Sequence, residues 1–457
     1  MGPIKESTEY VRMTRQPQPD IETLGECVDQ ALQMTHRHGA NSAEASASFR
    51  AGLSVTARMR DVETLEYHRD QGLGVTVFFG QQKGSASTSD LSPAAIEETV
   101  RRACTLAQFT TGDACAGLAD PQLLATRIPD LDLYHPWSIE PYQAIDLAIE
   151  CEAAALDADE RIDNSEGATL STSSGCSVYG NTNGFLAGYR DSHHSLSCAV
   201  IARQGGQMER DFEYTVTRRA SELAAGALIG RQAAQRSLRR LGARKLDTRK
   251  VPVLLSPRIA RGFFGHLIGA ISGGSLYRKA TFLPDSIDTR VLAECVTIDE
   301  QPHIRGGLAS APFDAEGVET RNRRLVDRGI LRGYVLGSYY ARKLGLQTTG
   351  NAGGIHNLVV SDTGQGFTDL LAALDTGLLV NEVMGQGINP VTGDYSRGAA
   401  GFWVEGGEIQ YPVSEITIAG NLRDMYRNIV ALGTDTDQRG GIRTGSALIE
   451  EMTVAGN

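Results

Sequence analysis

Residues 262–279, GFFGHLIGAISGGSLYRK, place one histidine, His266, in an apolar and glycine-rich segment. A zinc site on a helix needs two ligands about one turn apart on the same face, usually with a carboxylate that acts as general base. From Pro257 to Lys279 the sequence contains no second histidine and no Asp or Glu. This segment therefore lacks the residues of a self-sufficient zinc peptidase motif.

Other residue types that could do chemistry lack the spacing they need. His193 and His194 are adjacent in a predicted strand, where neighbouring side chains point to opposite faces, so they are not expected to share a metal. The seven cysteines include no CxxC pair and indicate reduced thiols. No GxSxG elbow, GxxxxGK[ST] loop or GxGxxG turn opening a helix occurs, so the sequence predicts no local nucleophile or phosphate cradle.

Three polar, glycine-rich segments remain, at residues 272–279, 348–357 and 384–421. Their composition is typical of turns in a β structure. Alternatively, glycines allow a peptide backbone to approach and strand edges can pair with it, which predicts a peptide-binding groove. The candidate substrate-binding residues are His266, Arg278, Lys279, His356, Asn357, Asp394, Tyr395 and Arg397.

The elements expected before residue 244 are helices and antiparallel strands. Apolar spacing and capping residues predict helices over 20–38, from Ser92-Pro93 onward, over about 140–157 and over about 218–241. Short alternating segments between residues 45 and 88 indicate an antiparallel meander. A second sheet is expected around the turns at 182–184 and 205–206, whose glycines supply the positive φ of a hairpin.

After residue 244 the sequence is rich in strands. Residues 251–256 predict a buried strand, and Ser256-Pro257 predicts the start of the helix that carries His266. Turns are expected at 327–329 and 406–407, and a short helix near 337–344. Because hairpins rather than crossover helices join the strands, the predicted fold class is α+β.

The predicted organisation is two domains after a mobile leader at residues 1–19. An N-terminal domain over 20–243 combines an antiparallel sheet with helices, and a β-rich domain over 244–457 is barrel-like or sandwich-like.

Charge and hydropathy restrict the class of partner. The net charge is −11 and the pI about 5.4, which disfavours direct binding of nucleic acid. No apolar run approaches the ~18 residues of a membrane span, and the N-terminus lacks the apolar stretch of a signal peptide. We therefore expect a cytoplasmic protein.

Several motifs carry a family resemblance. DYSRGAAGFWVEGGEIQYPVSEITIAGNL, TTGNAGGIHN and HLIGAISGGSLYRKATF, with the shorter SLRRLGARKL, DLDLYHPW and KGSASTSDLSP, resemble the TldD/PmbA (modulator of DNA gyrase) family from about residue 20 onward. The resemblance implies a cytoplasmic bacterial protein that pairs with a TldD-type chain in a zinc-dependent protease trimming unstructured peptides. It also implies roles in peptide-antibiotic precursor maturation and antitoxin turnover.

The resemblance further implies where a metal would be held. The catalytic sister chain carries HExxxH on the helix before its own Arg-Lys pair, and a zinc-binding cysteine near its C-terminus. Anchored on Arg278-Lys279, the ligand positions fall on residues such as Phe264, Gly265 and Gly269. No cysteine follows Cys295. No metal or cofactor is therefore expected in this chain, and zinc is expected in the partner subunit.

Three functions remain open. The first is a non-catalytic subunit that completes the peptide chamber of a TldD–TldE type peptidase. The second is a self-sufficient homodimeric metallopeptidase, with zinc held by dispersed groups such as His266, His356 and Asp394. The third is a non-enzymatic protein that binds extended peptides or stabilises its partner.

Overall fold

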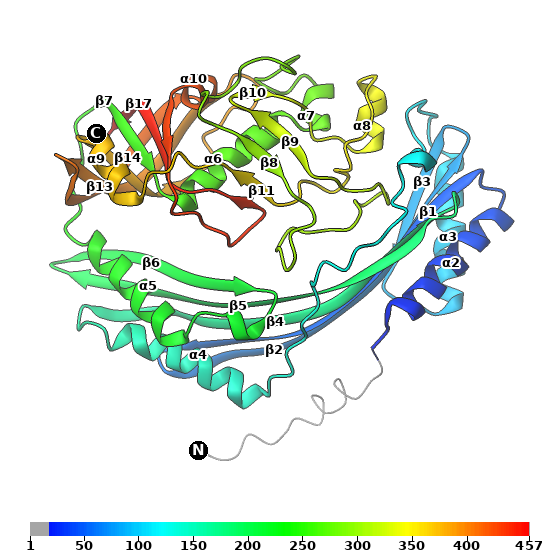
Figure 1. Ribbon diagram of the computed structural model, residues 1–457. Helices are drawn as coiled ribbons and strands as arrows, with labels where there is room; N and C mark the ends of the chain where they lie inside the picture. Colours follow the sequence, from blue (N-terminus) through cyan, green and yellow to red (C-terminus); the bar gives the residue numbers. More distant parts are fainter. Residues whose placement is uncertain (1–17, 457) are drawn as a thin grey trace.

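A computed structural model describes residues 18–456 of the chain, so most of the predicted leader lies outside the described residues. Figure 1 shows a long curved sheet with helices on its outer side and a β-rich part seated in its hollow. The α+β class is confirmed. The C-terminal part contains a closed sheet, as the barrel-like prediction required.

The curved sheet has six antiparallel strands in the order β3-β2-β1-β4-β5-β6. Their bounds are β1 Ser42–Arg58, β2 Asp61–Phe79, β3 Gln82–Thr88, β4 Ile162–Asn181, β5 Leu186–Gln204 and β6 Gln207–Thr217. Because β1 pairs with both β2 and β4, the predicted meander and the predicted second sheet are one sheet. The antiparallel sheet predicted for the N-terminal part is confirmed. Its two sets of strands could not be joined from hairpin signals, because such signals report neighbours in sequence, whereas this pairing joins strands more than 100 residues apart.

Strand β1 shows how alternation divides the faces of this sheet. Ala43, Ala45 and Ala47 are buried against the helices, whereas the alternating residues Ser46 and Ser48 point to the other face. Successive side chains of a strand point to opposite faces, so the small apolar residues make the helix-covered side. The serines line the hollow that receives the C-terminal part.

Four helices cover the outer face of the sheet: α2 Ile21–Arg37, α3 Pro93–Gln108, α4 Pro141–Leu156 and α5 Gly226–Arg240. Asp20 caps α2, and Ser92 caps α3 with Pro93 in the first turn, the latter as predicted. The last helix is shorter than predicted. Residues 220–222 form a 3₁₀ turn, and the Arg218 side chain bonds to Asp191, so the chain turns before α5 begins.

The second large sheet closes on itself. Its order is β14-β13-β12-β7-β17-β15, and an additional pairing of β14 with β17 completes the ring. The bounds are β7 Arg249–Leu255, β12 Gly377–Met384, β13 Asp394–Glu405, β14 Glu408–Asn421, β15 Ile429–Leu432 and β17 Ala447–Ala455. Much of the glycine-rich segment 384–421 is therefore strand, and Gly406-Gly407 make the predicted turn between β13 and β14.

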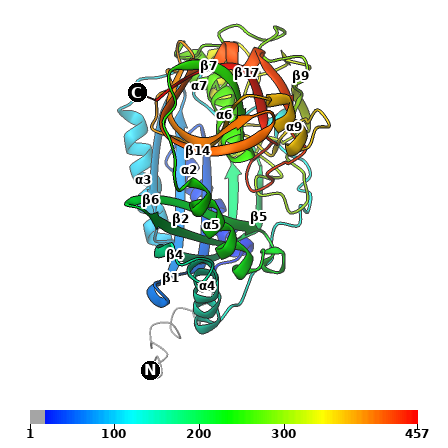
Figure 2. The ribbon, with the colours of Figure 1, turned by 90° about the vertical axis from the view of Figure 1, so that its left-hand side faces the viewer.

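Helix α6, Pro257–Ala270, runs through this closed sheet (Figure 2). Phe263, Phe264 and Leu267 are buried with the inward side chains of the strands. On β7, Val253 and Leu255 face this core, while Leu254 packs outward under α9, Phe367–Leu374. Strand alternation thus separates a helix-filled interior from a helix-covered exterior.

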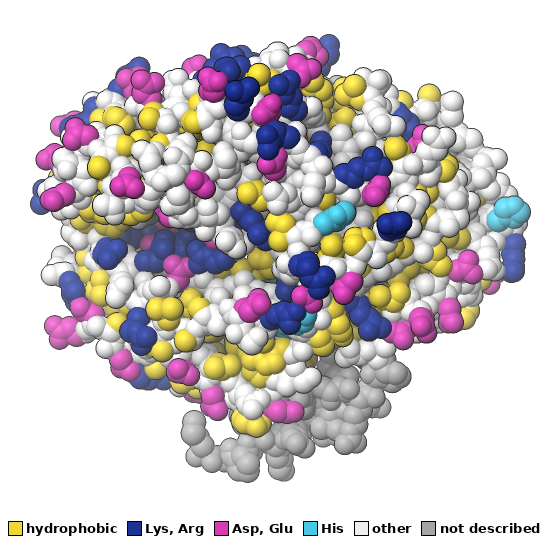
Figure 3. All heavy atoms as spheres, viewed as in Figure 1, with side chains coloured by type: hydrophobic (Ala, Val, Ile, Leu, Met, Phe, Trp, Pro, Cys, Tyr) yellow, Lys and Arg dark blue, Asp and Glu magenta, His cyan; other side chains and the backbone are white. Residues whose placement is uncertain are grey.

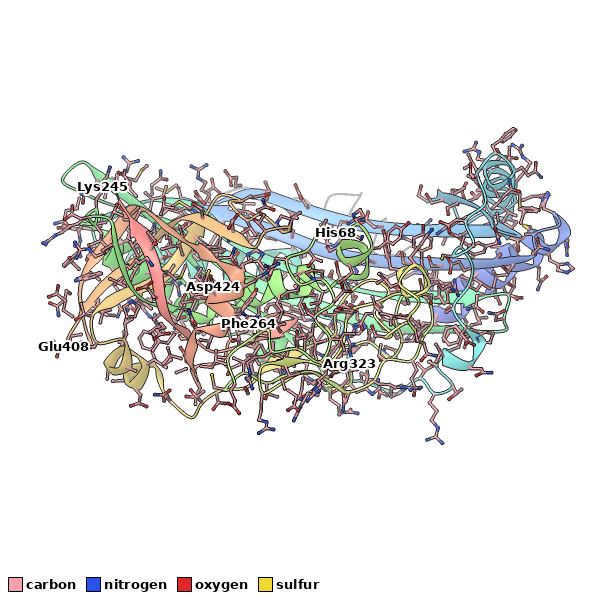
Figure 4. All side chains as sticks on the ribbon, turned by 90° about the horizontal axis from the view of Figure 1, so that it is seen from above. His68, Lys245, Phe264, Arg323, Glu408 and Asp424 are labelled. Carbon is pink, nitrogen blue, oxygen red and sulfur yellow. The ribbon has the colours of Figure 1, made fainter. Side chains whose placement is uncertain are left out.

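A smaller sheet and short helices complete the C-terminal part. The sheet order is β10-β9-β8-β11-β16, with bounds β8 Ile298–Glu300, β9 Arg323–Asp327, β10 Ile330–Leu331, β11 Leu358–Val360 and β16 Ile442–Arg443. The short helices are α7 Gly273–Tyr277, α8 Ser338–Lys343 and α10 Leu422–Arg427. From above, Figure 4 places Phe264 among the strands of the closed sheet and Arg323 toward the smaller sheet.

Candidate functional site

Helix α6 carries the residue that first suggested chemistry, His266. Its imidazole is half-buried, and its ring centroid lies 6.2 Å from that of Tyr395 on β13 in an edge-on arrangement. Burial lowers the pKa of His266, and the positive charge of Arg397 lowers it further. The side chain is therefore a neutral imidazole at neutral pH, beside a cation.

Tyr395 and Arg397 lie on the face of β13 that is turned toward His266 of α6. Tyr395 is 3% exposed, and burial raises the pKa of its phenol. The Nε atom of Arg397 is buried and has no hydrogen-bond partner among residues 18–456. The structure brings these three predicted residues together. The guanidinium beside them opposes the binding of a metal cation.

Arg278 and Lys279 follow α7, at a different place. Arg278 donates a long hydrogen bond of 3.4 Å to the hydroxyl of Tyr340 on α8, and Lys279 adopts a left-handed backbone with φ of 53°. The neighbouring Lys343 ammonium lies 5.5 Å from the ring centroid of Tyr277. These cations and aromatic rings form an exposed surface.

His356 and Asn357 lie where the C-terminal part meets the hollow of the curved sheet. The imidazole of His356 borders a cavity of about 400 Å³ that also touches Ser46 and Ser177. Asn357 is fully buried, and its Nδ2 donates to Ser310 Oγ at 2.7 Å and to the Gln301 carbonyl at 3.0 Å. Asn357 therefore serves the packing of its own loop.

Asp394 directly precedes Tyr395 at the start of β13. Its carboxylate accepts hydrogen bonds from Thr392 Oγ1 at 2.6 Å and Asn421 Nδ2 at 3.1 Å, and these bonds lower its pKa. It shapes the exposed turn before β13. Among the described residues, no three or more His, Cys, Asp or Glu side chains form a group that could hold a metal ion. Within residues 18–456 of one chain, His266, His356 and Asp394 therefore form no shared metal site.

The pattern of strand edges also corrects the groove hypothesis. Strand β13 pairs with β12 on one side and β14 on the other, and β14 pairs with β17. Closing a sheet removes its free edges, so the backbone of 394–404 cannot add a peptide strand. A sequence pattern cannot reveal this closure, since β17 lies at the other end of the C-terminal part.

Sequence reasoning missed a cavity with a volume of about 960 Å³. It lies between α5 and the closed sheet, at the first turn of α6. The residues lining it are Arg236, Arg239, Ser256, Pro257, Arg258, Phe367, Leu379, Asn381, Phe402, Ile409, Gln410, Tyr411, Pro412, Asp435, Thr436, Asp437, Gln438 and Arg439. The available signal was the basic run SLRRLGARK near the end of α5, read only as a domain junction.

Carboxylates of β6 stand behind the arginines of this cavity. Arg236 Nη1 lies 3.0 Å from Glu213 Oε2, and Arg439 Nη1 lies 2.5 Å from Glu213 Oε1. Burial acts to raise the pKa of Glu213, but hydrogen bonds from the Tyr214 N–H and Arg439 and the charge of Arg236 lower it overall. The ion pair between Arg439 and Glu213 thus joins the loop before β16 to the curved sheet.

The residues on α6 do not fit the zinc ion of a peptidase. A Cβ at Gly265 would lie 4.0 Å from the Ile442 methyl group, and one at Gly269 would meet nothing within 4 Å. Phe264 is buried in the core. Zinc requires nitrogen, sulfur or carboxylate ligands, and these positions supply none. No step of a reaction is assigned to a metal in this chain.

The closed sheet threaded by a helix, set in a curved antiparallel sheet, defines a two-part α+β protein with an arginine-lined cavity between its parts. Models of the PmbA/TldA metallopeptidase domain 1, central domain and C-terminal domain match residues 43–107, 134–241 and 248–456. The chain belongs to the PmbA/TldA metallopeptidase family.

Three relatives illustrate the similarity. The chain is 50% identical to the metalloprotease PmbA of Escherichia coli O157:H7 over 446 residues, 98% of this chain and 99% of the relative. A candidate modulator of DNA gyrase from Bacteroides thetaiotaomicron has a solved structure with a TM-score of 0.90 and 26% identity, covering 95% of this chain and 99% of the other. The structure of TldE from Thermococcus kodakarensis shares the fold, with a TM-score of 0.79 and 19% identity, covering 94% of this chain and 99% of the other.

No helix among residues 18–456 combines the length and apolar character that a membrane crossing requires.

Proposed function

We propose that this chain is the non-metallated subunit of a TldD–TldE type peptidase that degrades or trims unfolded peptides in the cytoplasm. A TldD-type partner supplies the zinc and the general base, and this chain helps to enclose and hold the peptide. Substrates of this kind include peptide-antibiotic precursors and antitoxins.

The observation that carries the proposal is the chemistry of α6. Helix α6 keeps its place in the closed sheet, yet Gly265 and Gly269 have no side chain to offer a metal, and Arg397 lies beside the remaining His266. A guanidinium is always protonated near neutral pH and repels a divalent cation. This charge supports a role for α6 as scaffold.

Substrate contact by the exposed predicted residues is part of this proposal. Arg278 and Lys279 with the aromatic rings of α7 and α8 form one surface, and His356 borders another cavity. Cationic and aromatic side chains suit an unfolded peptide because they bind carboxylates, carbonyls and apolar side chains without requiring one sequence.

The test is peptide cleavage and metal content, measured on four samples: this chain alone, the chain stripped of metal, a TldD-type partner alone, and the mixture. We expect zinc in the partner only, and cleavage of an unfolded peptide at the full rate only in the mixture. Stoichiometric zinc and turnover in this chain alone would overturn the proposal in favour of the homodimeric metallopeptidase.

The same samples distinguish a purely binding role. If this chain captures peptides or stabilises the partner against unfolding, but the partner's turnover rate is the same with and without it, the chain does not shape the catalytic chamber. That result would favour a non-enzymatic peptide-binding protein.

A further inference from the structure

The cavity between α5 and the closed sheet has the size and the polar groups of a ligand site. Ligand pockets in proteins measure roughly 300–1,000 Å³, and this cavity measures about 960 Å³. In Figure 3, Lys and Arg side chains gather in the recess between the upper and lower parts of the molecule, toward the left. The cavity can therefore hold several groups of one ligand.

Four guanidinium groups line the cavity, and they come from three separate segments. Arg236 and Arg239 lie on α5, Arg258 lies in the first turn of α6, and Arg439 lies in the loop before β16. Two carboxylates, Asp435 and Asp437, also line it.

Those two carboxylates are already engaged. Asp435 accepts hydrogen bonds from the backbone N–H and the hydroxyl of Ser446, at 2.8 and 2.6 Å. Asp437 accepts from Arg439 Nε at 3.0 Å and from Arg261 Nη2 at 3.3 Å. Their oxygens are therefore committed to the protein.

The donors of the cavity are unequally used. Arg258 donates to the Phe212 carbonyl at 3.0 Å and to Asp211 at 3.4 Å, and its guanidinium carbon lies 4.1 Å from the Phe212 ring centroid. Its Nε, however, is buried and has no hydrogen-bond partner in residues 18–456. Arg239 has no ion pair within the same described range, and its side chain is exposed. Burial lowers the pKa of Arg258, and the nearby charges of Arg236 and Arg439 act in the same direction, whereas Asp211 and Glu213 act against them. Arg239 is therefore the guanidinium of the cavity that is most available to an incoming anion.

The N-terminus of α6 adds two features to the same wall. Ser256 is the N-cap residue, yet its hydroxyl makes no capping hydrogen bond and is buried without a partner among residues 18–456. A 14-residue helix also carries a partial positive charge at this end. Both features favour a negatively charged oxygen in front of Ser256 and Arg258.

The opposite wall of the cavity is apolar and aromatic. It is made by Phe367, Leu379, Phe402, Ile409, Tyr411 and Pro412. A ligand that fills the cavity therefore needs an apolar body as well as an anionic group. A free inorganic ion would leave the apolar wall uncovered.

The net charge near the cavity limits the charge of that group. Asp211 and Glu213 stand behind the arginines and, with Asp435 and Asp437, offset much of their positive charge. These four carboxylates equal the four guanidinium groups in number, so a doubly charged phosphate is disfavoured. A single negative charge placed against Arg239, which has no ion pair among the described residues, fits better.

From these observations we propose that the cavity binds a carboxylate of an extended peptide, either an Asp or Glu side chain or the C-terminal carboxylate. The carboxylate lies against Arg239, Arg258 and Ser256, and the adjoining side chains lie on the apolar wall. The inference rests on the proposed function, since it names the class of peptide that this chain holds for the peptidase.

The test measures the affinity of the full-length chain for four labelled peptides of equal length by fluorescence anisotropy. The peptides contain Glu or Gln at the same positions, each with a free or an amidated C-terminus. We expect the Gln peptide amide to bind about tenfold or more weakly than the best acidic peptide, because hydrogen bonds to charged groups contribute about 1.5–3 kcal/mol. The Glu peptide amide and the Gln peptide free acid identify which carboxylate is read.

Two variants and a matched control locate the site. R239Q should weaken binding of the acidic peptide about twofold to fivefold. R258K keeps a positive charge but loses the Nε–H donor, and should weaken it by about tenfold. R231Q removes the same charge from an exposed position of α5 outside the cavity and should leave the affinity unchanged. If R258K does not fold, R239Q against R231Q still decides.

Three results would overturn the inference: equal affinity for all four peptides, an acidic preference that R239Q reduces no more than R231Q does, or displacement of the peptide by phosphate more strongly than by chloride at equal ionic strength. These results leave the proposed function intact if the chain still raises the turnover of a TldD-type partner. Absence of that effect, together with no peptide binding, would mean that the proposed function itself is wrong.

Discussion

The cluster around Glu300 and the arginine-lined cavity are both built from arginines, carboxylates and small polar residues, but they differ in how many hydrogen bonds are made. In the Glu300 cluster, the carboxylate accepts from Arg323 Nε at 2.7 Å, Asn351 Nδ2 at 2.7 Å and the His356 N–H at 2.8 Å. Arg323 also donates to the Tyr334 carbonyl and to Asn351, so all three of its nitrogens are used.

In the cavity, Arg258 Nε and Ser256 Oγ are buried without a partner among residues 18–456. A satisfied buried network stabilises one conformation, whereas donors without partners beside an open volume are available to a ligand. The difference teaches that polar composition does not distinguish a binding loop from a structural one. The glycine-rich segment 348–357 belongs mainly to the structural kind.

The largest expected effect comes from breaking the Glu300 cluster. R323M leaves the Glu300 carboxylate, which is 2% exposed, without its cation. Removing one partner of a buried ion pair costs about 3–5 kcal/mol. Urea denaturation should show that decrease in the free energy of unfolding. The control is R324M, at the neighbouring residue of β9. It removes an exposed ion pair with Asp299 of β8 and should cost less than about 1 kcal/mol.

A smaller loss is expected for N357A. The substitution removes the hydrogen bonds to Ser310, Gln301 and the Ala309 N–H, and it places a Cβ residue without a polar side chain at φ of 38°. Thermal or urea denaturation should show a loss of about 2–3 kcal/mol. N357G should recover about 1 kcal/mol, since glycine tolerates positive φ. Wild-type stability of N357A would show that the hydrogen bonds of Asn357 do not stabilise its loop.

Two Ser-Pro helix starts offer a matched pair with a still smaller effect. Ser92 Oγ accepts a hydrogen bond from the Ala95 N–H at 3.4 Å, whereas Ser256 Oγ makes no such bond. S92A should therefore lower the free energy of unfolding by about 0.5–1 kcal/mol. S256A should leave it unchanged or raise it slightly, because the substitution removes a buried hydroxyl that has no hydrogen-bond partner among residues 18–456. An equal loss in both variants would mean that Ser256 is an ordinary cap, contrary to the role assigned to it in the cavity.

The smallest effect on stability is expected for an exposed ion pair between the N-terminal and C-terminal parts of the chain. It lies outside both the Glu300 cluster and the arginine-lined cavity. Asp113 lies 2.9 Å from Lys343 Nζ and accepts from the Tyr339 hydroxyl at 2.7 Å. The hydrogen bond from Lys343, with those from the Cys115 N–H and Tyr339, lowers the pKa of Asp113 to about 2. Its pKa in the unfolded chain is about 3.9.

Because the folded pKa is the lower one, the contribution of Asp113 is present above pH 4 and is lost as the pH falls through about 2. The difference in unfolding midpoint between wild type and D113N should therefore be constant from pH 7 to about 4.5 and should shrink toward pH 2. A difference that persists at pH 2 would show that the contact does not depend on the carboxylate charge.

Sequence periodicity predicted most elements because their signals are local. The caps at Asp20 and Ser92, the hairpins at 182–184 and 205–206, and the start of α6 at Ser256-Pro257 each depend on residues a few positions apart. The site was predicted only in part. His266, Tyr395 and Arg397 do come together, whereas Asn357 is a structural residue and Asp394 shapes a turn.

By itself, the sequence determined the α+β class, the order of helices and strands, and the lack of metal ligands on α6, because each follows from residue type and short-range spacing. Only the tertiary structure decided that β1 joins β4, that β14 meets β17, and that arginines of α5, α6 and the 435–439 loop surround one cavity. These contacts join residues far apart in the chain, and they depend on the summed packing of many side chains rather than on any local pattern.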